Sequence, residues 1–128
     1  MKLLLDTNTF YWGTTQPRRL SEAAEQQLRD PGNERLVSAV TAFELATKVN
    51  IDKLRLGVTV SEFLRRGLVE LRATPVPLEH HHASAVEGLP MLHRDPFDRL
   101  LIAQALVEDW PILTSDGIFK DYGVEIVW

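Results

Sequence analysis

Short apolar runs alternate with longer amphipathic segments along this chain, and the alternation predicts the order of strands and helices. Four apolar runs have the length and composition of strands: residues 2–5, 35–40, 110–113 and 123–127. A fifth run at 74–78 contains Pro75 and Pro77, which lack backbone donors, so we expect this strand at the edge of a sheet. Strands separated by helices predict an α/β fold whose mainly parallel sheet is covered on both faces.

The segments between the strands carry helix start and stop signals. We expect Thr7 or Asn8 to cap the first helix. Thr41 is expected to open another helix, which runs to about Lys53, through a Ser/Thr-x-x-Glu capping box with Glu44. Further helices are predicted at residues 21–30, 61–71, 79–83 and 97–107.

The sharpest helix start lies at Asp95, which has the features of an N-cap and is followed by Pro96 at the first helical position. Asp98 then occupies the third position, where a carboxylate can meet free backbone amides. The helix that follows is apolar on nearly every face, and Asp98 shares a stripe with its core positions. Capping explains Asp98 when this residue is considered alone; the alternative is that its carboxylate faces a cation beside the core.

Four carboxylates are expected along one edge of the predicted sheet. Asp6 and Asp116 each follow an apolar strand, and Glu44 and Asp98 stand near the starts of helices that open at the same edge. In open α/β sheets, ligands bind outside the carboxyl ends of the strands. Capping, or a pair between Glu44 and Lys48, accounts for single acids, but it does not explain why all four gather at one edge.

Four neighbouring carboxylates repel one another unless some are protonated or a divalent cation neutralises them. Oxygen ligands without cysteine or a convergent set of histidines predict Mg²⁺ or Mn²⁺ rather than Zn²⁺. The run His80–His82 does not change this expectation, because consecutive helical residues point in different directions and cannot easily share one ion. We interpret that run as a helix surface.

Composition narrows the class of protein. The chain has 128 residues, a hydrophobic share of 45% and no linker or repeat, which predicts a single domain over residues 1–128. No apolar run approaches a membrane span and Asp6 ends the first one early, so we expect a cytoplasmic protein with no membrane partner. The net charge of −4 argues against a protein that coats nucleic acid, although it permits a nuclease that engages phosphate through metals. The absence of cysteine excludes disulfides and thiolate chemistry.

Several segments resemble the PIN-domain ribonucleases, and among them the VapC-type toxins of bacterial VapBC toxin–antitoxin systems. They are Leu3–Asn8, Ser38–Ala46, His93–Ala105 and Leu113–Asp116, followed by a closing strand near Gly123. The segment His93–Ala105 is the most specific of these, and the resemblance spans essentially the whole chain. It implies a PIN-like three-layer α/β/α fold around a mainly parallel, roughly five-stranded central sheet.

The resemblance also implies the residues of a site. Its acidic quartet, which would be catalytic and would hold one or two Mg²⁺ or Mn²⁺ ions, corresponds to Asp6, Glu44, Asp98 and Asp116. Thr114 is the hydroxyl that accompanies the last acid. Basic side chains are needed to bring RNA to an acidic protein, and we expect Lys48, Arg94 and Arg99 among them.

The activity implied by the resemblance is hydrolysis of a structured RNA, such as a tRNA or a ribosomal loop, to 5′-phosphate and 3′-hydroxyl ends. The implied partners are a cognate VapB-type antitoxin and a second copy of the chain in a homodimer. Two other functions stay open: a non-catalytic RNA- or protein-binding module on a PIN scaffold, and phosphoryl transfer through an aspartyl nucleophile at Asp6. Against the last, Asn8 stands where such a hydrolase would need a second acid.

Overall fold

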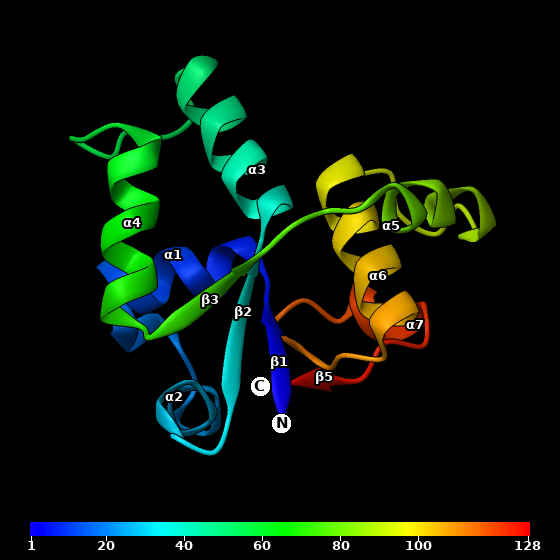
Figure 1. Ribbon diagram of the computed structural model, residues 1–128, viewed down its shortest axis with the longest axis horizontal. Coiled ribbons are helices and arrows are strands. Elements are labelled where there is room, and N and C mark those ends of the chain that lie inside the picture. Colours follow the sequence, from blue (N-terminus) through cyan, green and yellow to red (C-terminus); the bar gives the residue numbers. More distant parts are fainter.

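The computed structural model describes all 128 residues, with one sheet and helices on both sides of it (Figure 1). The strands are β1 (Lys2–Leu5), β2 (Glu34–Ser38), β3 (Ala73–Val76), β4 (Ile112–Leu113) and β5 (Ile126–Val127). The helices are α1 (Thr7–Thr15), α2 (Glu22–Arg29), α3 (Ala39–Asn50), α4 (Val60–Glu70), α5 (His80–Ser84), α6 (Pro96–Glu108) and α7 (Ile118–Asp121), with short 3₁₀ helices η1 (Pro17–Arg19) and η2 (Ala85–Gly88). None of these helices has both the length and the apolar character needed to cross a membrane.

The five strands are all parallel and lie in the order β3-β2-β1-β4-β5. The predicted parallel sheet is therefore confirmed, and β3, with Pro75 inside it, lies at an edge as expected. The chain first builds outward from β1 to β3 and then returns to the other side of β1 to place β4. The point where the strand order reverses, between β1 and β4, is where an open α/β sheet forms a crevice at its carboxyl edge.

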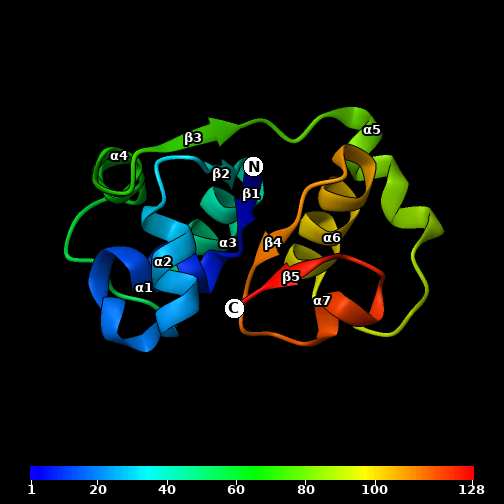
Figure 2. The ribbon, with the colours of Figure 1, turned by 90° about the horizontal axis from the view of Figure 1, so that it is seen from below.

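Alternate residues of β1 feed two separate cores, because successive side chains of a strand point to opposite faces. Leu3 and Leu5 pack in one cluster with Phe10 of α1 and with residues of α2 and α4. Leu4 packs in the other cluster with Ile102 of α6 and with residues of α7. Figure 2 shows α1, α2 and α4 on one side of the sheet and α5, α6 and α7 on the other. The predicted three-layer α/β/α architecture is confirmed.

Helix α3 begins earlier than the sequence predicted. Its N-cap is Ser38, whose hydroxyl accepts a hydrogen bond from Val40 N at 3.1 Å, so the predicted strand to residue 40 and the capping box from Thr41 are both wrong. Pairing between β2 and β3 ends at Ser38, which frees the chain to turn into a helix there. The hydroxyl of Thr41 instead meets that of Thr7 at 3.1 Å, and Glu44 lies in the second turn rather than at the helix start.

Helix α1 is also capped by a residue other than the predicted ones. Asp6 is its N-cap and accepts from Thr9 N at 2.6 Å, whereas Thr7 and Asn8 are already helical. Strand β1 ends at Leu5, so Asp6 is the one extended residue left between strand and helix. The first acid of the predicted quartet therefore also starts a helix.

Candidate active site

The candidate site opens at the carboxyl edge of the sheet, where Asp6 leaves β1 and Thr114 leaves β4. Asp6 is buried and both of its carboxylate oxygens are engaged: Oδ1 accepts from Thr9 N, and Oδ2 accepts from the hydroxyl of Thr114. Thr9 in turn donates its hydroxyl to Leu113 O at 2.7 Å, which ties the start of α1 to β4. Adjacent strands thus fix the position of Asp6.

Burial raises the pKa of Asp6 above its ordinary value, since a charged carboxylate loses hydration in this crevice. The hydrogen bonds from Thr114 and Thr9 lower this pKa without cancelling the effect of burial, and the charge of Glu44 raises it further. Glu44 is therefore close enough to Asp6 for the two acids to repel each other.

Glu44 projects from α3 and is buried, with one carboxylate oxygen paired and the other alone. Oε2 lies 2.6 Å from Lys48 Nζ, which confirms the predicted pair at four-residue spacing. Oε1 is buried and accepts no hydrogen bond from any group of the protein. An unsatisfied buried carboxylate oxygen is costly, so this atom marks a position where the protein lacks a donor or a cation.

Asp98 projects from the first turn of α6 but does not cap that helix. Asp95 is the cap, as the sequence predicted, and accepts from Phe97 N at 2.8 Å and Asp98 N at 3.1 Å. The capping explanation of Asp98 is wrong, because its Oδ2 lies 2.8 Å from Nε2 of His93. Burial raises the pKa of Asp98 to about 6; the charges of Asp95 and Glu44 also raise it, while the hydrogen bond with His93 lowers it.

A loop clamp, made by Arg99 and Tyr122, places His93 beside Asp98. The guanidinium of Arg99 is largely buried and donates to Pro90 O at 2.9 Å and to the Tyr122 hydroxyl at 3.1 Å. That hydroxyl accepts from the backbone amides of Leu92 at 3.2 Å and His93 at 2.9 Å. Longer hydrogen bonds join Arg99 to the carbonyl oxygens of Val86, Leu89 and His93.

These contacts change the role expected for Arg99 and give a role to His93. Arg99 uses its guanidinium to hold the loop before α6, which leaves it no role in the groove expected for RNA. His93 received no role from the sequence, although it begins the most specific of the family-like segments. The only feature of the sequence that points to His93 is its place two residues before the helix cap Asp95. Its contact with Asp98 depends on the path of the loop, which no local sequence pattern indicates.

The other predicted site residues lie at the rim. Asp116 is exposed, and its Oδ1 accepts from Ile118 N at 3.0 Å. Its backbone amide donates to the Thr114 hydroxyl at 3.0 Å, so Thr114 connects the loop of Asp116 with the carboxylate of Asp6. Arg94 is exposed on the loop that leads into α6. The charge of Glu44 acts on both Asp6 and Asp98, which places these three acids in one neighbourhood. The carboxylate of Asp116 accepts from Ile118 N and makes no hydrogen bond with any of them.

The histidine run is only partly a helix surface. His80 and His81 are exposed, but His82 is buried: its Nδ1 accepts from Glu79 N at 2.9 Å and its Nε2 lies 2.8 Å from Glu108 Oε1. Because Nδ1 accepts, the proton belongs on Nε2, which donates to Glu108. Ligand atoms of His81, His82 and Glu108 lie within 4.8 Å of one another, but this tautomer directs a proton rather than a lone pair at Glu108. We interpret the group as a tether between α5 and α6.

The donor atoms of the candidate site suit a hard divalent cation. Ligand atoms of His93, Asp95 and Asp98 lie within 4.8 Å of one another, so an acidic cluster that can hold a metal surrounds Asp98. The unpaired Oε1 of Glu44 adds a further carboxylate oxygen that lacks a partner. Oxygen-rich sets of this kind are typical of magnesium, manganese and calcium sites.

A parallel sheet with acids gathered at its switch point defines an α/β protein with a ligand site at the carboxyl edge. The PIN domain family matches residues 3–125, and the chain belongs to this family. It is 32% identical over 121 residues to Ribonuclease VapC22 of Mycobacterium tuberculosis, which covers 94% of this chain and 91% of the relative.

Solved structures share the same fold over nearly the whole chain. VapBC2 from Rickettsia felis, bound to a DNA fragment from its promoter, matches with a TM-score of 0.74 at 16% identity and covers 98% of this chain and 97% of its own. VapBC-1 from nontypeable Haemophilus influenzae matches with a TM-score of 0.63 at 15% identity, over 98% and 96% of the two chains. The resemblance and the PIN-like fold expected from the sequence are confirmed.

Proposed function

We propose that this protein is a metal-dependent endoribonuclease that acts as a toxin. The observation that carries the proposal is the carboxylate of Glu44, which is buried with Oε1 unpaired and whose charge helps to raise the pKa values of Asp6 and Asp98. Acids held at such a cost are a set that a bound divalent cation would stabilise. Membership of the PIN family and the ribonuclease relative support RNA as the substrate.

The quartet of Asp6, Glu44, Asp98 and Asp116 would hold the ion, which we propose to be Mg²⁺ or Mn²⁺. When bound, the ion supplies charge neutralisation for the phosphodiester and lowers the pKa of bound water. Two other residues of the chain position these ligands and balance their charge. Thr114 orients Asp6, and Lys48 offsets part of the charge of Glu44.

The proposed reaction is attack of water on the phosphorus of an RNA phosphodiester. A bond forms between the water oxygen and phosphorus, the bond to the 3′ oxygen breaks, and a proton goes to that oxygen. The products are a 5′-phosphate and a 3′-hydroxyl. Lys48 and Arg94 are the basic side chains left to contact the RNA, which we propose to be structured, such as a tRNA or a ribosomal loop.

We further propose that the chain works as one PIN domain over residues 1–128, in the cytoplasm, as a homodimer silenced by a VapB-type antitoxin. The solved structures of similar fold are complexes named VapBC, which supports a partner of this type. An acidic crevice favours an antitoxin segment that presents a basic side chain, because charge complementarity promotes docking there.

A cleavage assay on total cellular RNA tests the proposal. Wild-type protein free of antitoxin is compared with Asp98→Asn, with EDTA, and with Asp121→Asn, which removes an exposed acid on α7. Discrete fragments with 5′-phosphate ends from the wild type and Asp121→Asn alone are expected. RNA left intact by the wild type in Mg²⁺ and Mn²⁺ would overturn the proposal and favour a binding module that holds a metal without cleavage.

A further inference from the structure

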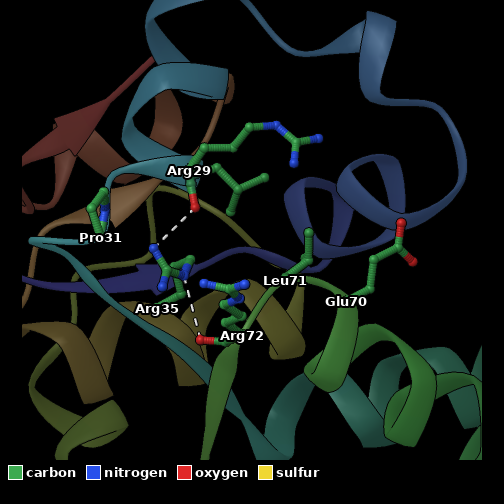
Figure 3. Close-up of a pocket in the computed structure, with 7 residues that line it drawn as sticks. Arg29, Pro31, Arg35, Glu70, Leu71 and Arg72 are labelled. Atoms are coloured by element: carbon green, nitrogen blue, oxygen red, sulfur yellow. Dashed lines mark hydrogen bonds between the residues drawn. The ribbon is translucent and has the colours of Figure 1, made fainter.

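A second cleft lies at the other end of the sheet from the carboxylates and has the opposite charge character. Its volume is about 400 Å³, and it is bounded by the end of α2, the start of β2 and the turn from α4 to β3 (Figure 3). Arg35, which lines it, stands opposite Leu3 in the sheet, whereas Asp6 of the candidate active site follows the last residue of β1. The cleft is therefore separate from the candidate active site.

Arg35 is a buried cation with one free donor nitrogen. Its Nη1 donates to Leu28 O at 3.2 Å and Asp30 O at 2.8 Å, and its Nε donates to Arg72 O at 3.4 Å. The residue is 8% exposed, forms no ion pair, and has no hydrogen bond from Nη2 to another group of the protein. The carbonyl contacts fix the plane of the guanidinium and leave Nη2 available to a ligand in the cleft.

Arg72 brings a second guanidinium to the same cleft. Its φ is +51°, in the left-handed region that favours glycine, so an arginine is a strained choice at this turn. The side chain is exposed and has neither an ion pair nor a hydrogen bond. In Figure 3 it extends over the cleft near Arg35.

The remaining charges do not neutralise this pair. Arg29 is bound to Glu25 at 2.7 Å, so its charge is already balanced. Glu70 lines the cleft but makes no ion pair, and Figure 3 shows its carboxylate pointing away from Arg35 and Arg72. The carbonyl groups at the end of α2 offset part of the charge of Arg35 and none of that of Arg72. The cleft thus keeps an excess of positive charge.

We propose that this cleft binds the phosphate group of a nucleotide-sized ligand. Planar guanidinium groups with free N–H bonds recognise phosphate oxygens in pairs. The cleft is also bounded by the exposed ring of Pro31, which offers an apolar surface to a ring attached to the phosphate, whereas Leu28 and Leu71 lie largely buried beneath it. The volume lies within the range of small-molecule sites. This binding function is independent of RNA cleavage at the acidic edge.

Titrations at constant ionic strength test the proposal, with ¹H–¹⁵N chemical shifts followed for backbone and arginine side chains. The probes are 5′-AMP, inorganic phosphate and adenosine. Saturable shifts at Arg35 and Arg72 with 5′-AMP, weaker ones with phosphate and none with adenosine are expected. Equal affinity for phosphate and 5′-AMP would overturn the role of Pro31, and shifts confined to other regions would overturn the site.

Arg72→Gly separates binding from folding. Glycine relieves the left-handed strain, so the variant is expected to unfold at the same temperature or higher while its affinity for 5′-AMP falls at least tenfold, as for the loss of one charge-assisted pair of hydrogen bonds. Arg55→Gly, which removes the same charge from an exposed loop, serves as the control and should bind as the wild type does. Unchanged affinity in Arg72→Gly would overturn the proposal.

Discussion

Asp6 and Asp98 stand in the same candidate site, yet the protein holds their carboxylates in different ways. Asp6 has both oxygens engaged by groups of α1 and of the segment just after β4, so the sheet itself sets its position. Asp98 has one oxygen on His93, which sits on a loop held by Arg99 and Tyr122. One acid is fixed by the scaffold, and the other depends on a side-chain network that can be altered without touching the sheet.

This difference separates two kinds of mutational effect. Changes around Asp6 should affect the proposed chemistry directly, because the carboxylate has no freedom to adjust. Changes around Asp98 should act through the clamp, and their effects should appear in metal affinity and pH dependence before they appear in the fold.

The largest effect is expected for Asp6→Asn. Asparagine caps helices as well as aspartate does, so α1 should remain intact. Loss of a charged ligand at a fixed position should lower the cleavage rate by about a thousandfold, because metal ions contribute several kcal/mol to such reactions. Cleavage kinetics and thermal unfolding measured on the same sample check this expectation. A folded variant that cleaves RNA at the wild-type rate would contradict the role of Asp6.

His93→Ala should come next, with metal affinity reduced by about ten- to a hundredfold, as is typical when a side chain that orients a ligand is removed. His80→Ala, an exposed histidine on α5, is the matched control. Calorimetric titration with Mn²⁺ measures both variants. The carboxyl ¹³C shift of Asp98 adds a second readout: its pKa in the metal-free variant should rise above the wild-type value of about 6, because His93 lowers it.

Tyr122→Phe should loosen the clamp itself. The hydroxyl accepts from Leu92 N and His93 N, and its loss leaves these two amides without a partner and removes one of the hydrogen bonds of Arg99, at a cost of about 1–3 kcal/mol in the free energy of unfolding. Tyr11→Phe removes a hydroxyl that has no hydrogen bond in the structure and provides the comparison. Denaturant unfolding should distinguish the two, and equal stability would show that the clamp contributes nothing.

The smallest effect is a pH dependence of stability in the metal-free protein. The pKa of Asp98 is about 6 in the folded state and near 3.8 in the unfolded chain, so the folded state binds the proton more tightly. Stability due to this group is therefore lost as pH rises from about 4 to 6 and stays low above that range. In EDTA, Asp98→Asn should unfold at a higher temperature than the wild type at pH 8 and closer to it at pH 4. If the unfolding temperatures of the two proteins changed in parallel with pH, the raised pKa of Asp98 would be contradicted.

The sequence predicted most of what depends on local pattern and sheet topology. The order of the strands and of the helices α1 to α6, the edge position of β3, the cap at Asp95 and the pair between Glu44 and Lys48 all follow from spacing and residue type. The short helix α7 between β4 and β5 was not predicted. The helix starts at Ser38 and Asp6 were missed, because they depend on where sheet pairing releases the chain. Thr7, Asn8 and Thr41, which are also good helix caps, lie one to three positions after the true caps, and the predicted helix starts were therefore too late.

The predictions that failed at the site depend on tertiary contacts. Arg99 looks like a free basic residue on a helix, but a loop wraps its guanidinium in carbonyl oxygens. His82 looks like part of an exposed run, but α6 brings Glu108 to its ring. In both, a polar side chain is buried because a distant backbone or carboxylate satisfies it, and a sequence pattern does not contain that information.

Paramagnetic broadening by Mn²⁺ tests the central claim, that the carboxyl edge of the sheet is a divalent-cation site. Backbone amide signals are recorded as Mn²⁺ is added in substoichiometric amounts. The account predicts selective loss of signals at Thr9, Glu44, Asp98 and Thr114, with those of Arg35 and Arg72 at the opposite end of the sheet kept sharp. Broadening centred on His82 and Glu108, or no localised broadening at all, would contradict it.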